Sequence, residues 1–126
     1  TIYAKLAWLQ FNNENLDDAL VSAEGALKAN PGLHGALYIA GSVHFNRAVE
    51  FLKEANNETD NDKYDAKKKS ALDLFKKSMP YFEKAINAQD DDTYSLNALS
   101  TIYDQLDMDD KRDAVLKKLE SLEGGE

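Results

Sequence analysis

The prediction of an all-α fold begins with residues 16–32, which read LDDALVSAEGALKANPG. Small and apolar residues recur here every three or four positions, which places them on one face of a helix. They are Leu16, Ala19, Leu20, Ala23, Ala26 and Leu27. Asn15 precedes them as a candidate N-cap, and Asn30-Pro31-Gly32 follows them as a helix-ending turn. The stretch therefore predicts one amphipathic helix.

The same spacing continues through the rest of the chain. Apolar stripes also cover residues 2–9, 37–55, 71–86, 96–106 and 115–122, with polar or acidic segments between them. In one of these segments, Asp90-Asp91-Asp92 forms the predicted turn and Thr93 is a candidate cap for the helix that follows. No segment alternates apolar and polar residues as a half-buried strand does. We therefore predict six helices, paired as three hairpins.

Pro80 falls inside the fourth predicted helix. Proline has no backbone N–H and crowds the preceding turn, so it kinks or breaks a helix. We expect a kink near residues 76–79. The alternative is that one helix ends there and Pro80 begins another.

The predicted hairpins repeat along the chain. The first helices carry matching triplets at Tyr3-Leu6-Ala7, Leu37-Ala40-Gly41 and Leu96-Leu99-Ser100. The second helices carry two matching sets, at Ala19-Ala23-Ala26-Pro31 and Ser78-Phe82-Ala85-Asp90. The step between these two sets equals the step between the last two triplets, and both are longer than the step between the first two triplets. One insertion in the middle hairpin therefore accounts for both of the longer steps.

The step between the first two triplets is about 34 residues, which is the helix-turn-helix period typical of tetratricopeptide repeats. The chain resembles that family over nearly its whole length. The resemblance implies one domain over residues 1–126, folded as a short right-handed α-solenoid of three hairpins at about 1–31, 34–90 and 93–122. The insertion, at about residues 51–75, should lengthen the middle hairpin into a projecting antiparallel arm. The third hairpin departs from the pattern, because Arg112 stands where Ala19 and Ser78 stand in the others.

A narrower resemblance concerns the arm and residues 79–85, MPYFEKA. Both are similar to tetratricopeptide proteins exported by Gram-negative bacteria, which implies a periplasmic rather than a cytoplasmic setting. The sequence also begins inside a helical pattern, so we expect it to be a piece of a longer chain.

Tetratricopeptide domains generally bind a peptide or helix of another protein in the groove lined by the first helix of each hairpin. Transferred by position, the resemblance places polar and aromatic residues in that groove, namely Trp8, Asn12, Tyr38, Ser42, Asn46, Asn97, Thr101, Asp104 and Gln105. Asparagine amides can hydrogen-bond a peptide backbone, and Trp8 and Tyr38 offer the rigid surface common in binding hot spots. The resemblance thus implies a protein-interaction scaffold. The alternative is that these are ordinary surface residues.

The expected partner is neutral or basic. Some family members clamp a partner's terminal carboxylates with lysines in this groove, and no lysine stands at the corresponding positions here. Asp104 and a net charge of -8 favour a neutral or basic segment instead. The same charge disfavours nucleic acid. No apolar run approaches the roughly 20 residues of a membrane span, so we expect no insertion into a membrane.

Two other surfaces remain as alternatives. Apolar residues in the last helix, Val115, Leu116, Leu119 and Leu122, could join copies of the chain into a homo-oligomer. In that case the chain would be a structural or self-association module. Phe51 and Tyr64 on the arm either form a second binding site or pack its two helices together.

No pattern indicates catalysis, a metal or a cofactor. The chain has no cysteine, no glycine-rich phosphate loop and no nucleophile elbow. Its two histidines, His34 and His44, are ten residues apart, a spacing that does not suit a metal pair on one helix. His44 occupies a position that Tyr103 fills in the third hairpin, so we expect core or boundary histidines. We therefore expect a protein that is not an enzyme and that has no cofactor.

Overall fold

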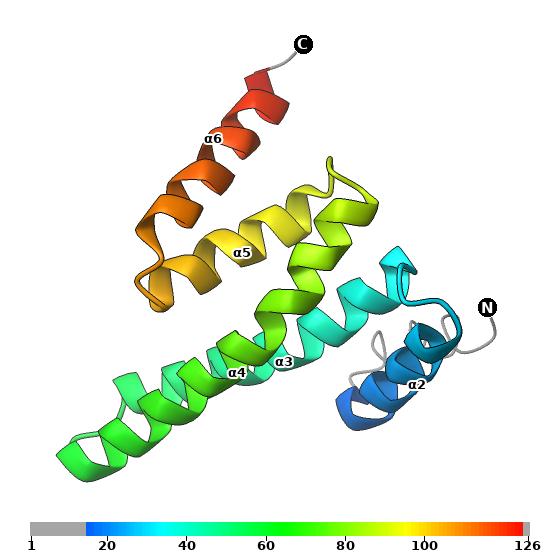
Figure 1. The fold of residues 1–126 in the computed structure, drawn as a ribbon. Coiled ribbons are helices and arrows are strands. Elements are labelled where there is room, and N and C mark those ends of the chain that lie inside the picture. The colour runs from blue at the N-terminus through cyan, green and yellow to red at the C-terminus, as the bar shows by residue number, and fades with distance from the viewer. Residues whose placement is uncertain (1–14, 125–126) are drawn as a thin grey trace.

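In the computed structural model, residues 15–124 are described, and they form five helices joined by short loops (Figure 1). These helices are α2 (Leu16–Ala29), α3 (His34–Asn56), α4 (Asn61–Ala88), α5 (Thr93–Gln105) and α6 (Asp109–Gly124). No strand occurs among residues 15–124, which confirms the predicted all-α class for this part of the chain. The predicted helix at residues 2–9 lies outside the described residues.

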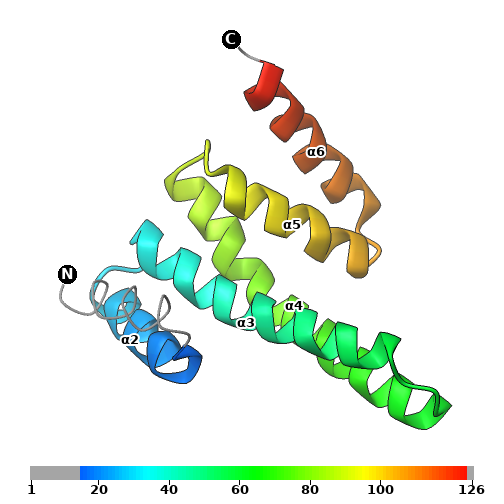
Figure 2. The same cartoon turned by 180° about the vertical axis from the view of Figure 1, so that it is seen from behind.

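Helices that are adjacent in the sequence also pack against one another. The main contacts join α2 to α3, α3 to α4, α4 to α5 and α5 to α6, and the α3–α4 contact is the most extensive. Figures 1 and 2 show that α3 and α5 run in the same general direction, while α4 returns in the opposite direction. The beginnings of α3 and α5 therefore lie at the same end of the molecule.

α3 and α4 are much longer than the other helices. They contain 23 and 28 residues, whereas α2, α5 and α6 contain 14, 13 and 16. The end of α3 and the start of α4 project together beyond the remaining helices (Figure 1). Ala55, Ala71 and Phe75 are fully buried along this pair. Phe51 is partly buried against the same core, and Tyr64 remains 36% exposed.

The centre of the core is a close approach of α3 and α4. Phe82 is fully buried, and a Cβ added at Gly41 would lie only 3.1 Å from its ring. One turn earlier on α4, the Ser78 hydroxyl donates to the Gly41 carbonyl at 2.8 Å. Glycine at this position therefore lets the Phe82 ring rest directly on the backbone of α3.

α4 continues through Pro80 without interruption. The alternative prediction, that one helix ends before Pro80 and another begins there, is wrong. Pro80 lies on an exposed side of the helix. Water can therefore bond the carbonyl that proline leaves without its usual N–H partner, which lowers the cost of keeping proline inside a helix.

Candidate functional site

One side of α5 carries a continuous exposed stripe. Tyr94, Asn97, Thr101 and Asp104 are all exposed, and their spacing of three or four residues places them on one face of the helix. We call these four residues the α5 face. The other sides of α5 face the main core and carry its buried residues Leu96, Leu99, Ile102 and Tyr103. The structure thus places three residues of the predicted groove on one surface, and adds Tyr94 to them.

Tyr38 joins α3 to the α5 face. Its ring lies 4.8 Å from that of Tyr94, centroid to centroid, with the planes inclined at 57°. Burial, followed by the nearby Tyr94 and Asp92, raises the pKa of Tyr38 to about 12. Tyr38 is therefore a neutral phenol at physiological pH. Tyr94 is 45% exposed, so the pair presents aromatic surface to solvent.

Asp92 fixes the beginning of the α5 face. As the residue before α5, it accepts the backbone N–H of Ser95 at 3.0 Å, which is the bond of a helix N-cap. Thr93, predicted as the cap, is instead the first residue of the helix. The other carboxylate oxygen accepts the Ser95 hydroxyl and the His34 Nε2–H, the latter at 2.7 Å. Because His34 begins α3, the Asp92 carboxylate ties together the starts of α3 and α5.

The surroundings of Asp92 keep it ionised. Burial raises its pKa, but the hydrogen bonds from the Ser95 side chain, the Ser95 backbone and His34 outweigh that effect. The net result is a pKa below the usual value for aspartate. The carboxylate is therefore negative at neutral pH and can accept all three bonds.

Ser95, His34 and Asp92 are the residue types of a catalytic triad, but their order differs. In a triad the histidine lies between the serine and the aspartate, so that it can take the serine proton. Here the aspartate lies in the middle and accepts from both partners. Ser95 is also fully buried. The group is a structural network that positions α5.

The other end of the α5 face is acidic. Arg112 of α6 contacts three carboxylates, those of Asp104 at 2.9 Å, Asp109 at 3.3 Å and Asp113 at 3.2 Å. One guanidinium cannot neutralise three carboxylates, so the local charge remains negative. A cavity of about 260 Å³ opens beside this group, lined by Ser100, Thr101, Asp104, Arg112 and Leu116.

The remaining predicted groove residues lie elsewhere. Trp8 and Asn12 are outside the described residues. Ser42 is fully buried, so it offers no surface to a ligand in this structure. Asn46 is partly exposed on α3, about two turns beyond Tyr38. The Gln105 side chain accepts from the Lys68 ammonium of α4 at 3.4 Å, at the far end of α5 from Tyr94.

Sequence reasoning missed Tyr94, Asp92 and the role of His34. Tyr94 could have been found, because it stands one turn before Asn97 in the same helical stripe. The contact between His34 and Asp92 joins residues 58 positions apart and has no signal in a single sequence.

His44 lies at the boundary of the core. It is partly buried, and its ring is stacked on Tyr81 with centroids 5.8 Å apart and planes 18° apart. Burial, followed by the charges of Lys77 and Arg47, lowers its pKa. This placement agrees with the expected boundary histidine.

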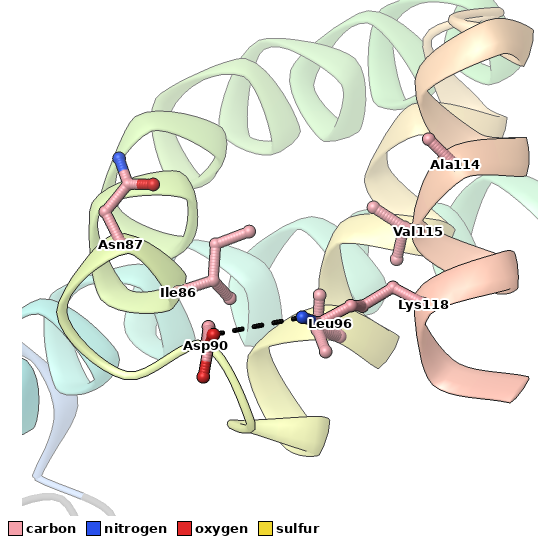
Figure 3. A pocket seen from close by; sticks show the side chains of 7 residues that line it. All are labelled: Ile86, Asn87, Asp90, Leu96, Ala114, Val115 and Lys118. Carbon is pink, nitrogen blue, oxygen red and sulfur yellow. Dashed lines mark ion pairs between the residues drawn. The ribbon is translucent and has the colours of Figure 1, made fainter. Parts of the chain in front are cut away.

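A second, more apolar cavity lies between the end of α4, the beginning of α5 and the middle of α6 (Figure 3). Its volume is about 290 Å³, and its lining consists of Ile86, Asn87, Asp90, Leu96, Ala114, Val115 and Lys118. The Lys118 ammonium lies 3.9 Å from the Asp90 carboxylate across it. On the same helix, Leu116 is 46% exposed, whereas Val115 and Leu119 are nearly buried.

Comparison with known proteins finds no family model and no curated protein that match this chain. None of the described helices has the length and apolar character needed to cross a membrane.

Proposed function

We propose that this chain is a tetratricopeptide-type interaction domain whose α5 face binds a segment of another protein. The observation that carries the proposal is the α5 face itself, a continuous exposed stripe that is aromatic at one end and acidic at the other. The sequential packing of α2 to α6 and the common direction of α3 and α5 support the proposed architecture, because first helices of successive repeats run side by side.

The chemistry of the face defines the partner segment. Tyr38 and Tyr94 offer rigid aromatic contact at a low cost in conformational entropy. Asn97 and Thr101 lie between the two ends and can hydrogen-bond a backbone. Asp104, with Asp109 and Asp113 around Arg112, supplies excess negative charge for a lysine or arginine. The partner is therefore a segment with an apolar and a basic anchor.

The spacing of the two anchors follows from helix geometry. Tyr94 and Asp104 are ten residues apart, which corresponds to roughly 15 Å along a helix. An extended peptide covers that distance in about four or five residues. The preferred ligand is thus a short extended segment with an aromatic or aliphatic residue at one end and a basic residue about four or five positions away.

Selection from a random peptide library on the purified chain tests this proposal. We expect selected peptides to carry the two anchors at that spacing. Tyr94→Ala should weaken their binding about tenfold, since a lost aromatic anchor typically costs more than about 1 kcal/mol. Asp104→Lys should weaken it at least as much and reduce its dependence on salt. Isothermal titration calorimetry gives the affinities.

Glu120→Gln is the matched control, because it removes an exposed negative charge of α6 outside the α5 face. Its affinities should equal those of the unchanged chain. Peptides that bind Tyr94→Ala and Asp104→Lys as tightly as the unchanged chain would place the binding site elsewhere.

Self-association is the second candidate function, and the exposure of Leu116 on α6, beside the cavity that it lines with Thr101 and Asp104, favours it. If the surface of α6 around Leu116 joins two copies of the chain, light scattering should show a molecular mass that rises with protein concentration. Leu116→Lys should then return the mass to that of a monomer, and Lys117→Gln, an exposed neighbour on α6, should not. A monomeric mass at all concentrations would exclude this function.

A further inference from the structure

A cavity of about 520 Å³ lies beside α3 and α4, away from the α5 face, with which it shares no residue. Lys77, Pro80, Tyr81 and Lys84 line it from one face of α4, and His44 lines it from α3. Its volume is within the range of small-molecule sites in proteins. Its lining combines two ammonium groups with the surfaces of two stacked rings.

The two lysines of this cavity have no acidic partner within residues 15–124. Most other described cations pair with a carboxylate within 4 Å, as Lys67 does with Glu58 and Lys118 with Asp90. The chain has 23 acidic and 15 basic residues, so carboxylates are abundant. Two ammonium groups without a described carboxylate partner over one cavity therefore concentrate positive charge in an otherwise acidic molecule.

His44 adds an imidazole ring whose pKa is lowered by its surroundings, so the ring is neutral at physiological pH. Its Nδ1 is buried and has no hydrogen-bond partner in the described part of the chain. The charged groups around it are Glu24 on α2, Arg47 on α3 and Lys77 on α4. Burial and the two cations lower the pKa of His44 and outweigh Glu24, which raises it. An anion bound beside Lys77 would offset that cation and raise the pKa again.

We propose that the cavity binds a small organic anion, whose carboxylate or phosphate group lies between Lys77 and Lys84 and whose apolar body rests on Tyr81 and Pro80. The two lysines are seven residues apart, or about 10 Å along α4, and their flexible stems can bring both ammonium groups to one oxyanion. A bare oxyanion would leave most of the 520 Å³ empty, so the attached body has room to contact the His44 and Tyr81 rings. The proposal is independent of binding at the α5 face.

Nuclear magnetic resonance titration tests the proposal with two matched probes, benzoate and phenyl phosphate, and with inorganic phosphate. We expect saturable shifts of His44 and Tyr81 resonances, and a higher pKa of His44 in the protein saturated with either aromatic anion. Inorganic phosphate should bind more weakly because it lacks the apolar body. Tighter binding of benzoate would identify a carboxylate ligand, and tighter binding of phenyl phosphate would identify a phosphate ligand.

Lys77→Gln and Lys84→Gln should each weaken binding of the preferred probe about fivefold, the scale expected for one partly exposed charge contact. Lys76→Gln is the control, because it removes the same charge from the adjacent position of α4 without touching the cavity. Circular dichroism checks that each variant remains helical. The proposal is overturned if Lys76→Gln weakens binding as much as the other two variants, or if His44 shows no saturable shift at millimolar probe.

Discussion

Phe82→Ala is expected to lower the free energy of unfolding by about 3–5 kcal/mol, the range for removing a fully buried phenylalanine. The Phe82 ring lies against the backbone of α3 at Gly41 and makes an edge contact with Phe45, with ring centroids 6.1 Å apart. Because Gly41 has no side chain, this position of α3 has no atoms that could fill the space left by the ring. Urea unfolding followed by circular dichroism measures the loss.

A double-mutant cycle with Gly41→Ala separates this contact from general destabilisation. Alanine is a better helix former than glycine by about 1 kcal/mol. In the unchanged chain, however, the added methyl group would lie 3.1 Å from the Phe82 ring, which is closer than ordinary contact. Gly41→Ala should therefore be clearly more favourable in the Phe82→Ala background, with a coupling of about 0.5 kcal/mol or more, as expected for residues in contact. Additive effects would contradict the close packing of α3 on Phe82.

Asp92→Ala is expected to lower the free energy of unfolding by about 2–3 kcal/mol at pH 7, which combines the loss of a helix cap with the loss of a buried acceptor. Loss of an N-cap typically costs about 1 kcal/mol. The change also leaves the Ser95 hydroxyl and the His34 ring without their acceptor, and an unsatisfied buried donor costs about 1–3 kcal/mol. Together the two losses amount to about 2–4 kcal/mol, and the partial exposure of His34 places the expected value in the lower half of that range. Asp91→Asn, an exposed neighbour, should have little effect.

The stabilisation that the Asp92 carboxylate provides should also depend on pH. The fold lowers the pKa of Asp92, so the stabilisation is fully present above the ordinary aspartate pKa of about 3.9. It is lost as the pH falls from there through the lowered pKa of the folded state. The stability difference between the unchanged chain and Asp92→Ala should therefore narrow below about pH 4. An equal difference at pH 7 and pH 3 would mean that the carboxylate charge is not what stabilises the network.

Helical spacing in the sequence correctly predicted the buried apolar face of α2. Ala19, Ala23 and Ala26 were placed on the buried side of their helix, and all three are fully buried. The turn at Asn30-Pro31-Gly32 was predicted where α2 ends at Ala29. These features depend on local geometry, because residues three and four apart share a helix face whatever surrounds the helix.

Features that depend on how helices cross could not be predicted in the same way. Ser42 lies one turn after Tyr38 on α3 and was assigned to the groove, but it is completely buried. Arg112 stands where the first two hairpins carry Ala19 and Ser78, which are fully buried. Its own side chain is only partly buried and pairs with Asp104 of α5. A single sequence shows which residues share one face of a helix. It does not show how much of the helix surface the neighbouring helices cover.

The contacts between α3 and α5 are concentrated at one end. His34 with Asp92 and Tyr38 with Tyr94 hold the first turns of the two helices together, while the extensive packing of each helix is with α4. At their other ends, α3 and α5 are held mainly by α4, so the distance between these ends can change more than the distance between the two first turns. In the proposed binding mode, we therefore expect bound segments of different thickness to be accommodated near Asp104, while the aromatic end keeps a constant width.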